Sequence, residues 1–410
     1  MKINHKITIY NLGPIDLIEE LEVKNINILI GESGKGKSII AKTAFIFNDF
    51  FHHPTFSISI EESLKEKLQK TLERFFYDYE NYKIKYQYSD DYYIEANKTS
   101  KKLNINFSKK LQDKISFIEN EVEKSALFQG LVGRDTSQGL EKIDKKRMQE
   151  LYDAIKKDED NKNKAYSIRR LVNELGLKET IFIPASRSFL LDLNDVIINS
   201  LLSGAEAMDE KNFEHMMLRF SKEYSKYKKL FNGIHKDFNQ ILKGSIISEG
   251  NQFKFKPNGK RSAKSHISLS SLSSGQKEIF PIAVILSKLI QDKKQILLII
   301  EEPEAHLFPE DQLKIFEILV YFANISNSQL IITTHSPYIC YIANNMLLAN
   351  KIKTIKKNKT IDPKNCQVNF LEDGKAKSIL QNEEIDTDYI DSASQITLKN
   401  YHELIAKENE

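Results

Sequence analysis

Cysteine is scarce in this chain of 410 residues, which contains only Cys340 and Cys366. Two cysteines are too few for a disulfide framework, and their separation does not match the spacing of metal ligands. The sequence also lacks a zinc cluster, an H-N-H constellation and a Cys–His pair that could form a nucleophile. We therefore expect two buried or incidental thiols in a reducing, cytoplasmic environment.

Long apolar runs are absent too. No stretch approaches the roughly 18 consecutive apolar residues that a membrane-spanning helix requires, so we expect no membrane partner. The opening run MKINHKITIY lacks the apolar core and the cleavage site of a secretory signal. Neither sign of charge dominates, with 60 basic and 57 acidic residues. This balance neither indicates nor excludes a nucleic-acid partner, because a basic groove can exist in a nearly neutral protein.

Patterns of apolar residues predict the secondary structure. Strands are predicted at Lys6–Tyr10, Ile26–Ile30, Tyr82–Tyr88, Tyr92–Glu95, Leu103–Phe107, Glu179–Pro184, Gln252–Lys256, His266–Leu269, Ile296–Ile300 and Gln329–Thr333, with a polar turn region between the first two. Helices are predicted at 60–82, 275–291 and 310–325, and the charged stretches 111–175 and 190–242 are mainly helical in pattern.

The order of these elements predicts an α/β protein. In the last third of the chain, continuous apolar strands alternate with helices, which is typical of a parallel sheet covered on both faces. The three short strands between 82 and 107 indicate a small antiparallel sheet. We therefore predict one α/β unit formed by residues 1–110 and 250–410, with a mainly helical insertion at 111–249.

A glycine-rich loop directly follows the strand at 26–30. Its sequence, Gly31-Glu32-Ser33-Gly34-Lys35-Gly36-Lys37-Ser38, matches G-x-x-x-x-G-K-[ST]. The glycines allow backbone N–H groups to turn inward around a phosphate, Lys37 reaches the β and γ oxygens, and Ser38 presents its hydroxyl to Mg²⁺. The helix that begins near Lys37 adds the positive end of its dipole. We predict an ATP-binding loop made of Gly31, Ser33, Gly34, Lys35, Gly36, Lys37, Ser38 and Ile39.

Carboxylates follow the strand at 296–300, in the run Glu301-Glu302-Pro303-Glu304. A strand that ends in carboxylates beside such a loop is suited to hold Mg²⁺ and to activate water. On this hypothesis Ser38 and Glu301 are metal ligands and Glu302 polarises the attacking water. The alternative is a solvated acidic strand end with Pro303 as a helix breaker.

Two further motifs admit both a structural and a functional interpretation. Leu272-Ser273-Ser274-Gly275-Gln276-Lys277-Glu278 is, by itself, a helix N-terminus with serine caps and a glutamate in the first turn. That interpretation leaves Gly275 and Gln276 unexplained, since stronger helix formers would be preferred there. His335 follows a strand in LIITTHSPY and is either a core or capping residue or a neutral donor beside a γ-phosphate.

In this order, the glycine-rich loop, the LSSGQ run, the acidic strand end and the later histidine together resemble the ABC-type ATPases. Within that family they are most similar to the RecF/SMC/OLD-like heads grouped among prokaryotic AAA-type ATPases. The specific motifs lie in residues 1–50 and about 250–345, and the rest matches only in general layout. The resemblance implies an ABC-type P-loop NTPase head, with a mixed or parallel central sheet and an antiparallel β lobe, that hydrolyses ATP with Mg²⁺.

The resemblance also implies that a second copy completes the active site. In such heads the LSxGQ segment contacts the nucleotide of the facing subunit, so four residues are expected to act in trans: Ser273, Ser274, Gly275 and Gln276. Glu302 is then expected to be the catalytic carboxylate and His335 the switch histidine. The stretch Pro303–Pro309, with His306 inside it, would be the dimer-contacting D-loop.

Some residues depart from the family pattern or fall outside it. Glu301 stands where aspartate is usual, and no glutamine occupies the Q-loop position. The best candidate there is Arg187, either as a phosphate contact or as a surface arginine in a loop. The basic clusters Lys226–Lys229 and Lys351–Lys359 are either nucleic-acid contacts or solvated faces. For Asp386 and Asp388 a polar turn is favoured over a metal site.

The parts of the chain outside the motifs indicate which biological role to expect. Residues 346–410 are too few for the TOPRIM nuclease domain of OLD-type enzymes, and the insertion is too short for a coiled-coil arm. The resemblance is thus to stand-alone ATPases of bacterial anti-phage defence, which dimerise through ATP and regulate a separately encoded effector, a nuclease or toxin. Alternatives are a RecF-like repair ATPase that clamps duplex DNA and a scaffold that binds ATP with little turnover. A transporter ATPase is the least favoured alternative, because the large helical insertion does not resemble those subunits.

Overall fold

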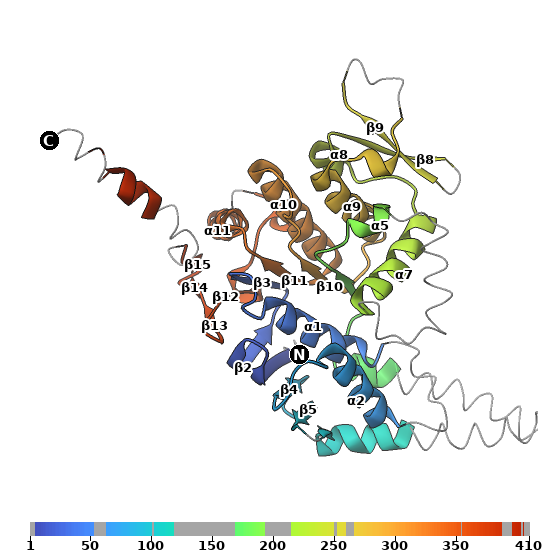
Figure 1. Cartoon of the computed structure of the whole chain (residues 1–410), viewed down its shortest axis with the longest axis vertical. Helices are drawn as coiled ribbons and strands as arrows, with labels where there is room; N and C mark the ends of the chain where they lie inside the picture. Colours follow the sequence, from blue (N-terminus) through green and yellow to red (C-terminus); the bar gives the residue numbers. More distant parts are fainter. Residues whose placement is uncertain are drawn as a thin grey trace, which may run out of the picture. The chain divides into compact units, whose positions relative to one another are not determined.

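The computed structural model describes residues 5–52, 63–100, 102–118, 169–192, 215–249, 252–259, 266–353, 355–387, 396–402 and 405. The chain divides into two compact units, one formed by Met1–Leu12 with Ile46–Glu179 and the other by Gly13–Phe45 with Thr180–Glu410 (Figure 1). The prediction was one unit of residues 1–110 and 250–410 with a helical insertion at 111–249. Much of the expected insertion lies outside the described residues, so its extent stays a prediction.

The first unit contains an antiparallel sheet. Its strands are β1 (His5–Leu12), β4 (Lys83–Gln87), β5 (Tyr93–Lys98) and β6 (Leu103–Phe107), which pair in the order β6-β5-β4-β1. Helix α2 (Leu64–Phe75) buries Leu64, Leu68 and Leu72 and begins with a capping box between Ser63 and Glu66. The antiparallel lobe expected from the strand pattern is therefore present. The helix is shorter than the predicted 60–82, and residues 60–62 lie outside the described part.

An aromatic cluster fills the core of this first unit. The ring of Phe47 stacks on Tyr86 with centroids 5.2 Å apart, and Tyr88 donates a hydrogen bond to the carbonyl oxygen of Phe47. His5 is buried among these rings, with Nδ1 3.0 Å from the hydroxyl of Tyr86 and Nε2 2.8 Å from the carbonyl oxygen of Leu175. Burial lowers the pKa of His5 to about 4, so its imidazole is neutral at physiological pH.

The second unit is built on a mixed sheet with a parallel centre. Its strands are β2 (Ile15–Val23), β3 (Ile26–Gly31), β7 (Thr180–Ile183), β10 (Leu297–Glu301), β11 (Gln329–Thr334), β12 (Cys366–Glu372) and β13 (Lys375–Ser378), in the order β2-β13-β12-β3-β11-β10-β7. The strands from β12 to β7 are all parallel, whereas β13 is antiparallel to β12. The predicted parallel sheet is confirmed, and so is the mixed α/β fold class.

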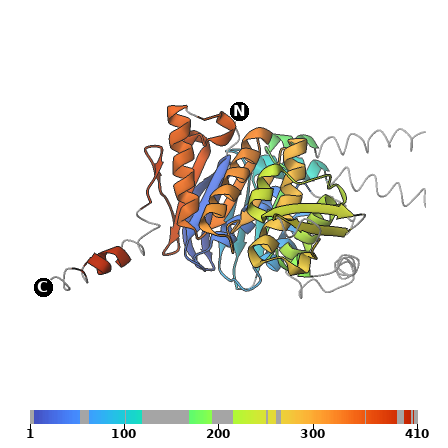
Figure 2. The same cartoon turned by 90° about the horizontal axis from the view of Figure 1, so that it is seen from above.

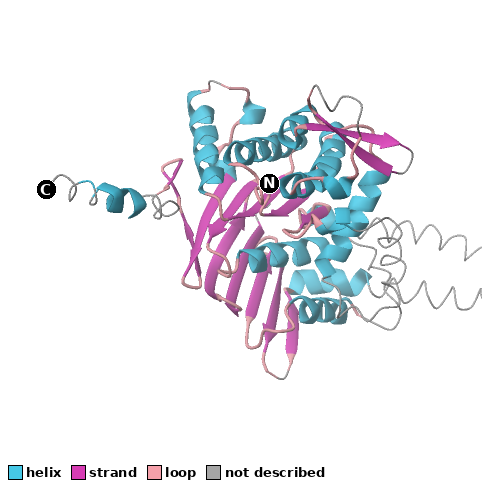
Figure 3. Cartoon of the chain, turned by 45° about the horizontal axis from the view of Figure 1, so that its top comes forward, coloured by secondary structure: helices cyan, strands magenta, loops and turns pink. Residues whose placement is uncertain are grey.

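Helices cover this sheet (Figure 3). They are α1 (Lys37–Asp49), α5 (Phe189–Asp192), α7 (His215–Lys229), α8 (Lys236–Leu242), α9 (Ser274–Asp292), α10 (Pro309–Ser326) and α11 (Pro337–Ile352), with 3-10 turns at Leu269–Ser271, Lys357–Lys359 and Pro363–Asn365. Two hairpins are also present: β8 (Gly244–Glu249) with β9 (Gln252–Pro257), and β14 (Leu380–Gln381) with β15 (Glu384–Ile385).

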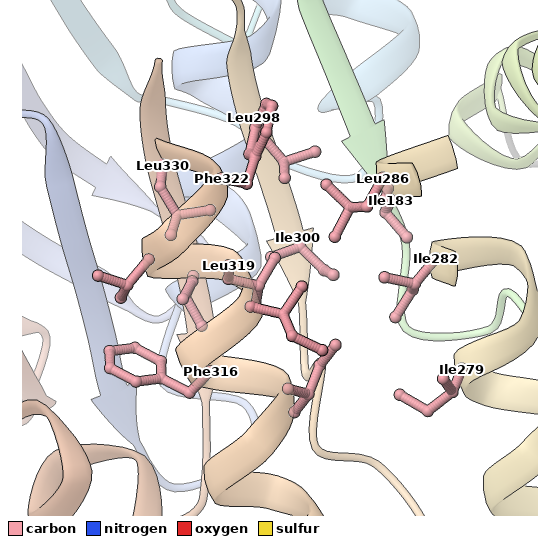
Figure 4. Packing of buried hydrophobic residues seen from close by; sticks show 14 of the residues in the cluster. Ile183, Ile279, Ile282, Leu286, Leu298, Ile300, Phe316, Leu319, Phe322 and Leu330 are labelled. Carbon is pink, nitrogen blue, oxygen red and sulfur yellow. The ribbon is translucent and has the colours of Figure 1, made fainter. Parts of the chain in front are cut away.

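The main core lies between the parallel strands and the helices α9 and α10. Figure 4 shows Leu298, Ile300 and Leu330 of the strands turned toward Phe316, Leu319 and Phe322 of α10, with Ile279, Ile282 and Leu286 of α9 nearby. Helices α10 and α11 pack side by side (orange in Figure 2). Helix α1 covers the opposite face of the sheet. The residues on either side of Phe182 in β7 point into the main core, so Phe182 points to the other face. There its ring centroid lies 5.6 Å from that of Phe45 in α1.

Strand β2 corrects the predicted polar turn region between the first two strands. Four acidic residues make it look polar, and its burial pattern breaks the usual alternation. Glu20 has a φ of 45°, so two exposed residues, Glu19 and Glu20, separate the buried Ile18 and Leu21. An irregularity of this kind removes the period of two by which strands are recognised in a sequence. Strand β8 was also missed, in the stretch just after the predicted helical region.

Several smaller expectations can be compared with the described residues. Cys340 and Cys366 are buried free thiols, as predicted. Helix α7 packs against β7 and α9, and its basic end at Lys226–Lys229 has a buried tyrosine, Tyr227, between exposed lysines. No helix among the described residues is both long and apolar enough to cross a membrane. Asp388 lies outside the described part, so the polar turn expected at Asp386 and Asp388 stays a prediction.

Candidate active site

The glycine-rich loop joins β3 to α1 inside the second unit. The amides of Ile39 and Ile40 donate to the carbonyl oxygen of Gly36, at 3.0 and 3.2 Å, and start the helix. Gly36 has a φ of 95°, and a Cβ atom there would lie 2.6 Å from Ile15. Only glycine fits this turn, since it needs both the left-handed backbone and the close approach. The loop therefore has the strand–turn–helix context that a phosphate-binding loop requires.

Lys37 is buried at the start of α1, although its side chain carries charge. Its Nζ donates to the carbonyl oxygens of Gly31 and Glu32, both at 2.7 Å. Burial lowers the pKa of Lys37, and the carboxylates of Glu302, Glu304, Glu301 and Glu32 act in the opposite direction. The ammonium group is thus held by its own loop and lies within the field of the acidic strand end.

Glu302 has an unusual backbone for a non-glycine residue. Its φ is 43°, and its amide donates to the carbonyl oxygen of Thr333 at 2.8 Å, just beyond the end of β10. Left-handed backbone costs a residue with a Cβ atom about 1 to 2 kcal/mol, so surrounding contacts must maintain it. The carboxylate is partly exposed, with 36% of the side chain accessible. The acidic strand end is therefore partly exposed to solvent, as one interpretation of the sequence expected, but its backbone is also held in a defined turn.

His335 connects the loop lysine to this carboxylate. Its Nδ1 lies 3.3 Å from Nζ of Lys37, and its Nε2 lies 2.9 Å from Oε1 of Glu302. An ammonium group can only donate, so Nδ1 accepts and Nε2 carries the proton that is donated to Glu302. The hydroxyl of Ser33 lies 3.5 Å from the same Nε2. Three motifs that are far apart in the sequence therefore meet at one imidazole.

Glu304 is a member of the site that the sequence analysis placed only within the stretch Pro303–Pro309, without a role of its own. Its buried Oε1 accepts hydrogen bonds from the hydroxyl of Thr334 and, at 3.1 Å, from the amide of His335. Burial raises the pKa of Glu304. The carboxyl group fixes the backbone that carries the histidine. The run EEPE contained it, but nothing in that run distinguished a buried third glutamate from an exposed one.

Glu301 is the last residue of β10 and is buried. Its Oε2 lies 3.4 Å from the amide of Ala185, and its Oε1 has no hydrogen-bond partner among the described residues. Ser38 is exposed in the first turn of α1. No hydrogen bond joins Ser38 to Glu301 in the described part of the chain, so the two predicted metal ligands are not brought into direct contact.

The LSSGQ run forms the start of α9. Ser273 is the N-cap and makes a capping box with Gln276, whose Nε2 also donates to the carbonyl oxygen of Leu242 at 2.7 Å. A Cβ atom on Gly275 would lie 2.6 Å from the carbonyl oxygen of His306. These contacts explain the two residues that helix propensity alone left unexplained. The hydrogen bonds of Ser273 and Gln276 do not reach the glycine-rich loop of the same described chain.

Glu278 and Arg187 both differ from the sequence-based expectation. Glu278 is the fifth residue of α9, beyond the first turn, and it is buried. Arg187 is also fully buried and pairs with it, with Nε 3.2 Å from Oε2 of Glu278. Arg187 is therefore not a surface arginine, and its donors point at backbone carbonyls rather than outward. The sequence gives no sign of this burial. Arginine is rarely fully buried unless it is paired, and the sequence does not identify a distant partner.

Residues 1–340 match the family described as AAA ATPase domain. Similar solved structures include the Smc head bound to the C-winged helix domain of ScpA, with 11% identity over 92% of this chain and 97% of that chain and a TM-score of 0.42. The SMC head domain from Thermotoga maritima has 9% identity over 92% and 98%, with a TM-score of 0.38. No curated protein matches the chain. Since the family match spans residues 1–340 of the 410 in the sequence, this chain belongs to the AAA ATPase domain family.

Proposed function

We propose that this chain binds ATP with Mg²⁺ at the loop Gly31–Ser38 and hydrolyses it, with Glu302 as the residue that activates water. The observation that carries the proposal is the meeting of Lys37, His335 and Glu302 within hydrogen-bond distance. A positioned cation, a phosphate-binding loop and a water-orienting carboxylate are the recurring parts of phosphoryl transfer. The family to which the chain belongs supports an ATPase of this kind.

Each side chain has a definite task in this proposal. The ammonium group of Lys37 exchanges its loop carbonyls for β- and γ-phosphate oxygens when ATP enters. Glu302 accepts a hydrogen bond from the water and aims it in line with the bond to be broken. His335 orients Glu302 from one side, and Glu304 fixes the backbone of His335. The Nε2–H group of the imidazole can transfer its hydrogen bond from Glu302 to the γ-phosphate and so report the nucleotide state.

The residues present fit a magnesium ion. Glu301 offers a buried Oε1 with no hydrogen-bond partner among the described residues, and Ser38 offers an exposed hydroxyl. Within the described ranges no group of three or more acidic, histidine or cysteine side chains could hold a metal alone. That matches Mg²⁺, which proteins usually bind through one or two carboxylates together with substrate phosphates and water. When bound, the ion neutralises charge that develops on the phosphate oxygens.

The second part of the proposal is that two copies share their ATP sites. The N-terminus of α9, at Ser273–Gln276, makes no hydrogen bond to its own loop in the described chain, so it is available to a partner's nucleotide. A helix N-terminus with serine hydroxyls is suited to an anion such as γ-phosphate. ATP then holds the two heads together, and hydrolysis separates them. The stretch Pro303–Pro309, with the exposed side chain of Phe308, would lie at that contact.

The biological role proposed here rests on resemblance rather than on geometry. We infer a cytoplasmic ATPase that regulates a separately encoded nuclease or toxin in bacterial anti-phage defence. In that role, ATP hydrolysis determines how long the ATP-bound dimer persists, and the nuclease or toxin carries out the effector reaction. Co-purification of the product of a neighbouring gene would test this part of the proposal.

The ATPase proposal is tested with Glu302→Gln in the full chain. We expect the variant to bind ATP, to persist as an ATP-dependent dimer and to release phosphate at least about a hundredfold more slowly, as removal of a catalytic group usually does. Lys37→Ala should instead lose ATP binding, and Glu80→Gln, an exposed residue of the first unit, should behave as wild type. Phosphate release at the wild-type rate by Glu302→Gln would show that another residue activates the water.

A DNA clamp of the RecF type is the second candidate. Lys222, Lys226 and Lys229 are exposed along one side of α7, at the spacing that places helical residues together. Binding of duplex DNA that requires ATP and weakens steeply with salt would favour this function. An ATPase rate that does not change when DNA is added, together with no such DNA binding, would favour the regulatory ATPase.

A further inference from the structure

Among the described residues, Arg187 is the largest fully buried side chain, and the proposed reaction leaves its task open. It lies four residues beyond the end of β7, and none of its side chain is exposed. Its Nη1 donates to the carbonyl oxygens of Pro184, at 3.0 Å, and of Glu301, at 2.8 Å. Its Nη2 donates to the carbonyl oxygen of Glu302 at 2.8 Å. The guanidinium thus binds the peptide backbone on which the catalytic carboxylate is mounted.

This arrangement is more specific than charge balance requires. Burial lowers the pKa of Arg187, and nearby carboxylates oppose the effect: Glu278, Glu304, Glu302 and Glu301. A cation placed only to neutralise them could bind their carboxylate oxygens. Arg187 instead directs two of its nitrogens at the main-chain oxygens of consecutive residues. A planar guanidinium is suited to that task, because its donors form a rigid fork.

The backbone that Arg187 holds is the strained one. Glu302 has a φ of 43°, in a region that a residue with a side chain occupies only when its surroundings enforce it. The hydrogen bonds to the carbonyl oxygens of Glu301 and Glu302 fix the peptide planes on both sides of the Glu302 Cα atom. They therefore stabilise the turn that directs the Glu302 side chain toward His335.

Arg187 also connects this turn to the helix that begins with the LSSGQ run. Its Nε donates to the carbonyl oxygen of Glu278 at 3.1 Å and lies 3.2 Å from the carboxylate of the same residue. Glu278 follows the N-cap Ser273 by five positions on α9. A second contact joins the same parts, since Gly275 lies against the carbonyl oxygen of His306 in the stretch that follows Glu302. A shift of α9 must therefore displace the backbone of Glu302.

We propose that Arg187 is a positioning residue for hydrolysis, which holds the Glu302 turn in register with α9. The inference deepens the proposed function and rests on it. It assigns the Q-loop position, where glutamine is expected in related heads, to an arginine that acts through backbone oxygens rather than on phosphate. Engagement of Ser273 with a partner's nucleotide would then be transmitted through Glu278 and Arg187 to the carboxylate that hydrolyses the chain's own ATP.

Arg187→Lys tests this inference, because lysine keeps the charge but carries its donors on one nitrogen, which cannot span the oxygens of Glu278, Glu301 and Glu302 as the guanidinium fork does. We expect ATP affinity within about threefold of wild type and a kcat about ten- to a hundredfold lower, the usual cost of misplacing a catalytic group by about 1 Å. The matched control is Arg170→Lys, an exposed arginine paired with Glu174, which should keep the wild-type kcat. A wild-type kcat in Arg187→Lys overturns the inference.

A double-mutant cycle separates positioning from a general loss of stability. If Arg187 acts through Glu302, then adding Arg187→Lys to Glu302→Gln should slow residual single-turnover hydrolysis no further. Full additivity of the two effects overturns the inference. Should Arg187→Lys fail to fold, Glu278→Gln decides: we expect a several-fold lower kcat with unchanged ATP affinity, and an unchanged kcat is the contrary result. If wild type itself releases no phosphate, the proposed ATPase function fails, which is distinguishable from a failure of the role of Arg187.

Discussion

Nε2 of His335 lies 2.9 Å from Oε1 of Glu302, while Nδ1 of the same ring lies 3.3 Å from Nζ of Lys37. One neutral imidazole therefore spans the distance between the phosphate-binding loop and the end of β10. The three residues lie in the second unit, at the start of α1 and just beyond the ends of β10 and β11, and His335 is fixed through its backbone by Glu304. This contact makes the histidine the most direct test of how the site is assembled.

His335→Ala should lower ATP turnover about ten- to a hundredfold and change ATP affinity only a few-fold. The substitution removes the group that orients Glu302, and orientation of a catalytic group contributes on that scale. His335→Gln should recover part of the rate, because its amide N–H can replace the donor at Nε2. Phosphate release and ATP titration of the full chain measure the two quantities. His402→Ala, at an exposed position, is the control; equal rates for all four proteins would contradict the role of His335.

Gly275→Ala should abolish ATP-dependent association while leaving ATP binding to the single chain intact. The added Cβ atom would lie 2.6 Å from the carbonyl oxygen of His306, so either the start of α9 or the stretch Pro303–Pro309 must move. Both segments are proposed to face the second copy. Light scattering of the eluting protein with and without ATP measures association, and Ser270→Ala provides an exposed serine control on the preceding turn. A Gly275→Ala variant that still dimerises and hydrolyses would refute the proposed contact.

The buried His5 predicts a stability loss in mild acid. Its pKa in the folded chain is lowered to about 4 from an ordinary 6.5, because burial disfavours the charged ring. The unfolded chain therefore binds the proton first, and the contribution is fully present above pH 6.5 and lost as the pH falls toward 4. A shift of this size corresponds to as much as about 3 kcal/mol in the free energy of unfolding.

Urea unfolding of the full chain at pH 7.5 and pH 4.5 measures this contribution. His5→Gln removes the titrating group, so its free energy of unfolding should fall less between the two pH values than that of wild type. Carboxylates elsewhere in the chain affect both proteins equally, which makes the difference between them the informative quantity. Parallel losses in the two proteins would show that His5 does not titrate as its burial requires.

Most of the local parts of the site could be predicted from the sequence. The run from Ile26 to Ser38 is contiguous, so an apolar strand, a glycine turn and a helix start were all visible in one segment. The strands β10 and β11 were predicted because both are buried on two faces and have continuously apolar centres, Leu297–Ile300 and Leu330–Ile332. The serine cap of α9 was equally local, since Ser273 and Gln276 stand at capping-box spacing.

Elements that depend on distant partners were not predicted. Strand β12 lies beside β3 in the centre of the sheet, although more than 300 residues separate Ile26 from Cys366 in the sequence. No pattern in the tail indicated that neighbour. Strand β2 was missed because its buried residues do not alternate, and Glu20 has a left-handed backbone within it.

The sequence by itself determined the glycine-rich loop, the acidic strand end and the helix that begins at the LSSGQ run, because each is specified by neighbouring residues. Only the tertiary structure decided that Arg187 is buried, that its donors hold the carbonyl oxygens of Glu301 and Glu302, and that His335 lies between Lys37 and Glu302. These contacts join residues 114 and 115 positions apart in the case of Arg187, and 298 in the case of Lys37 and His335. Hydrogen-bond partners at such separations are chosen by the packing of the sheet and its helices, and no local preference of the chain specifies them.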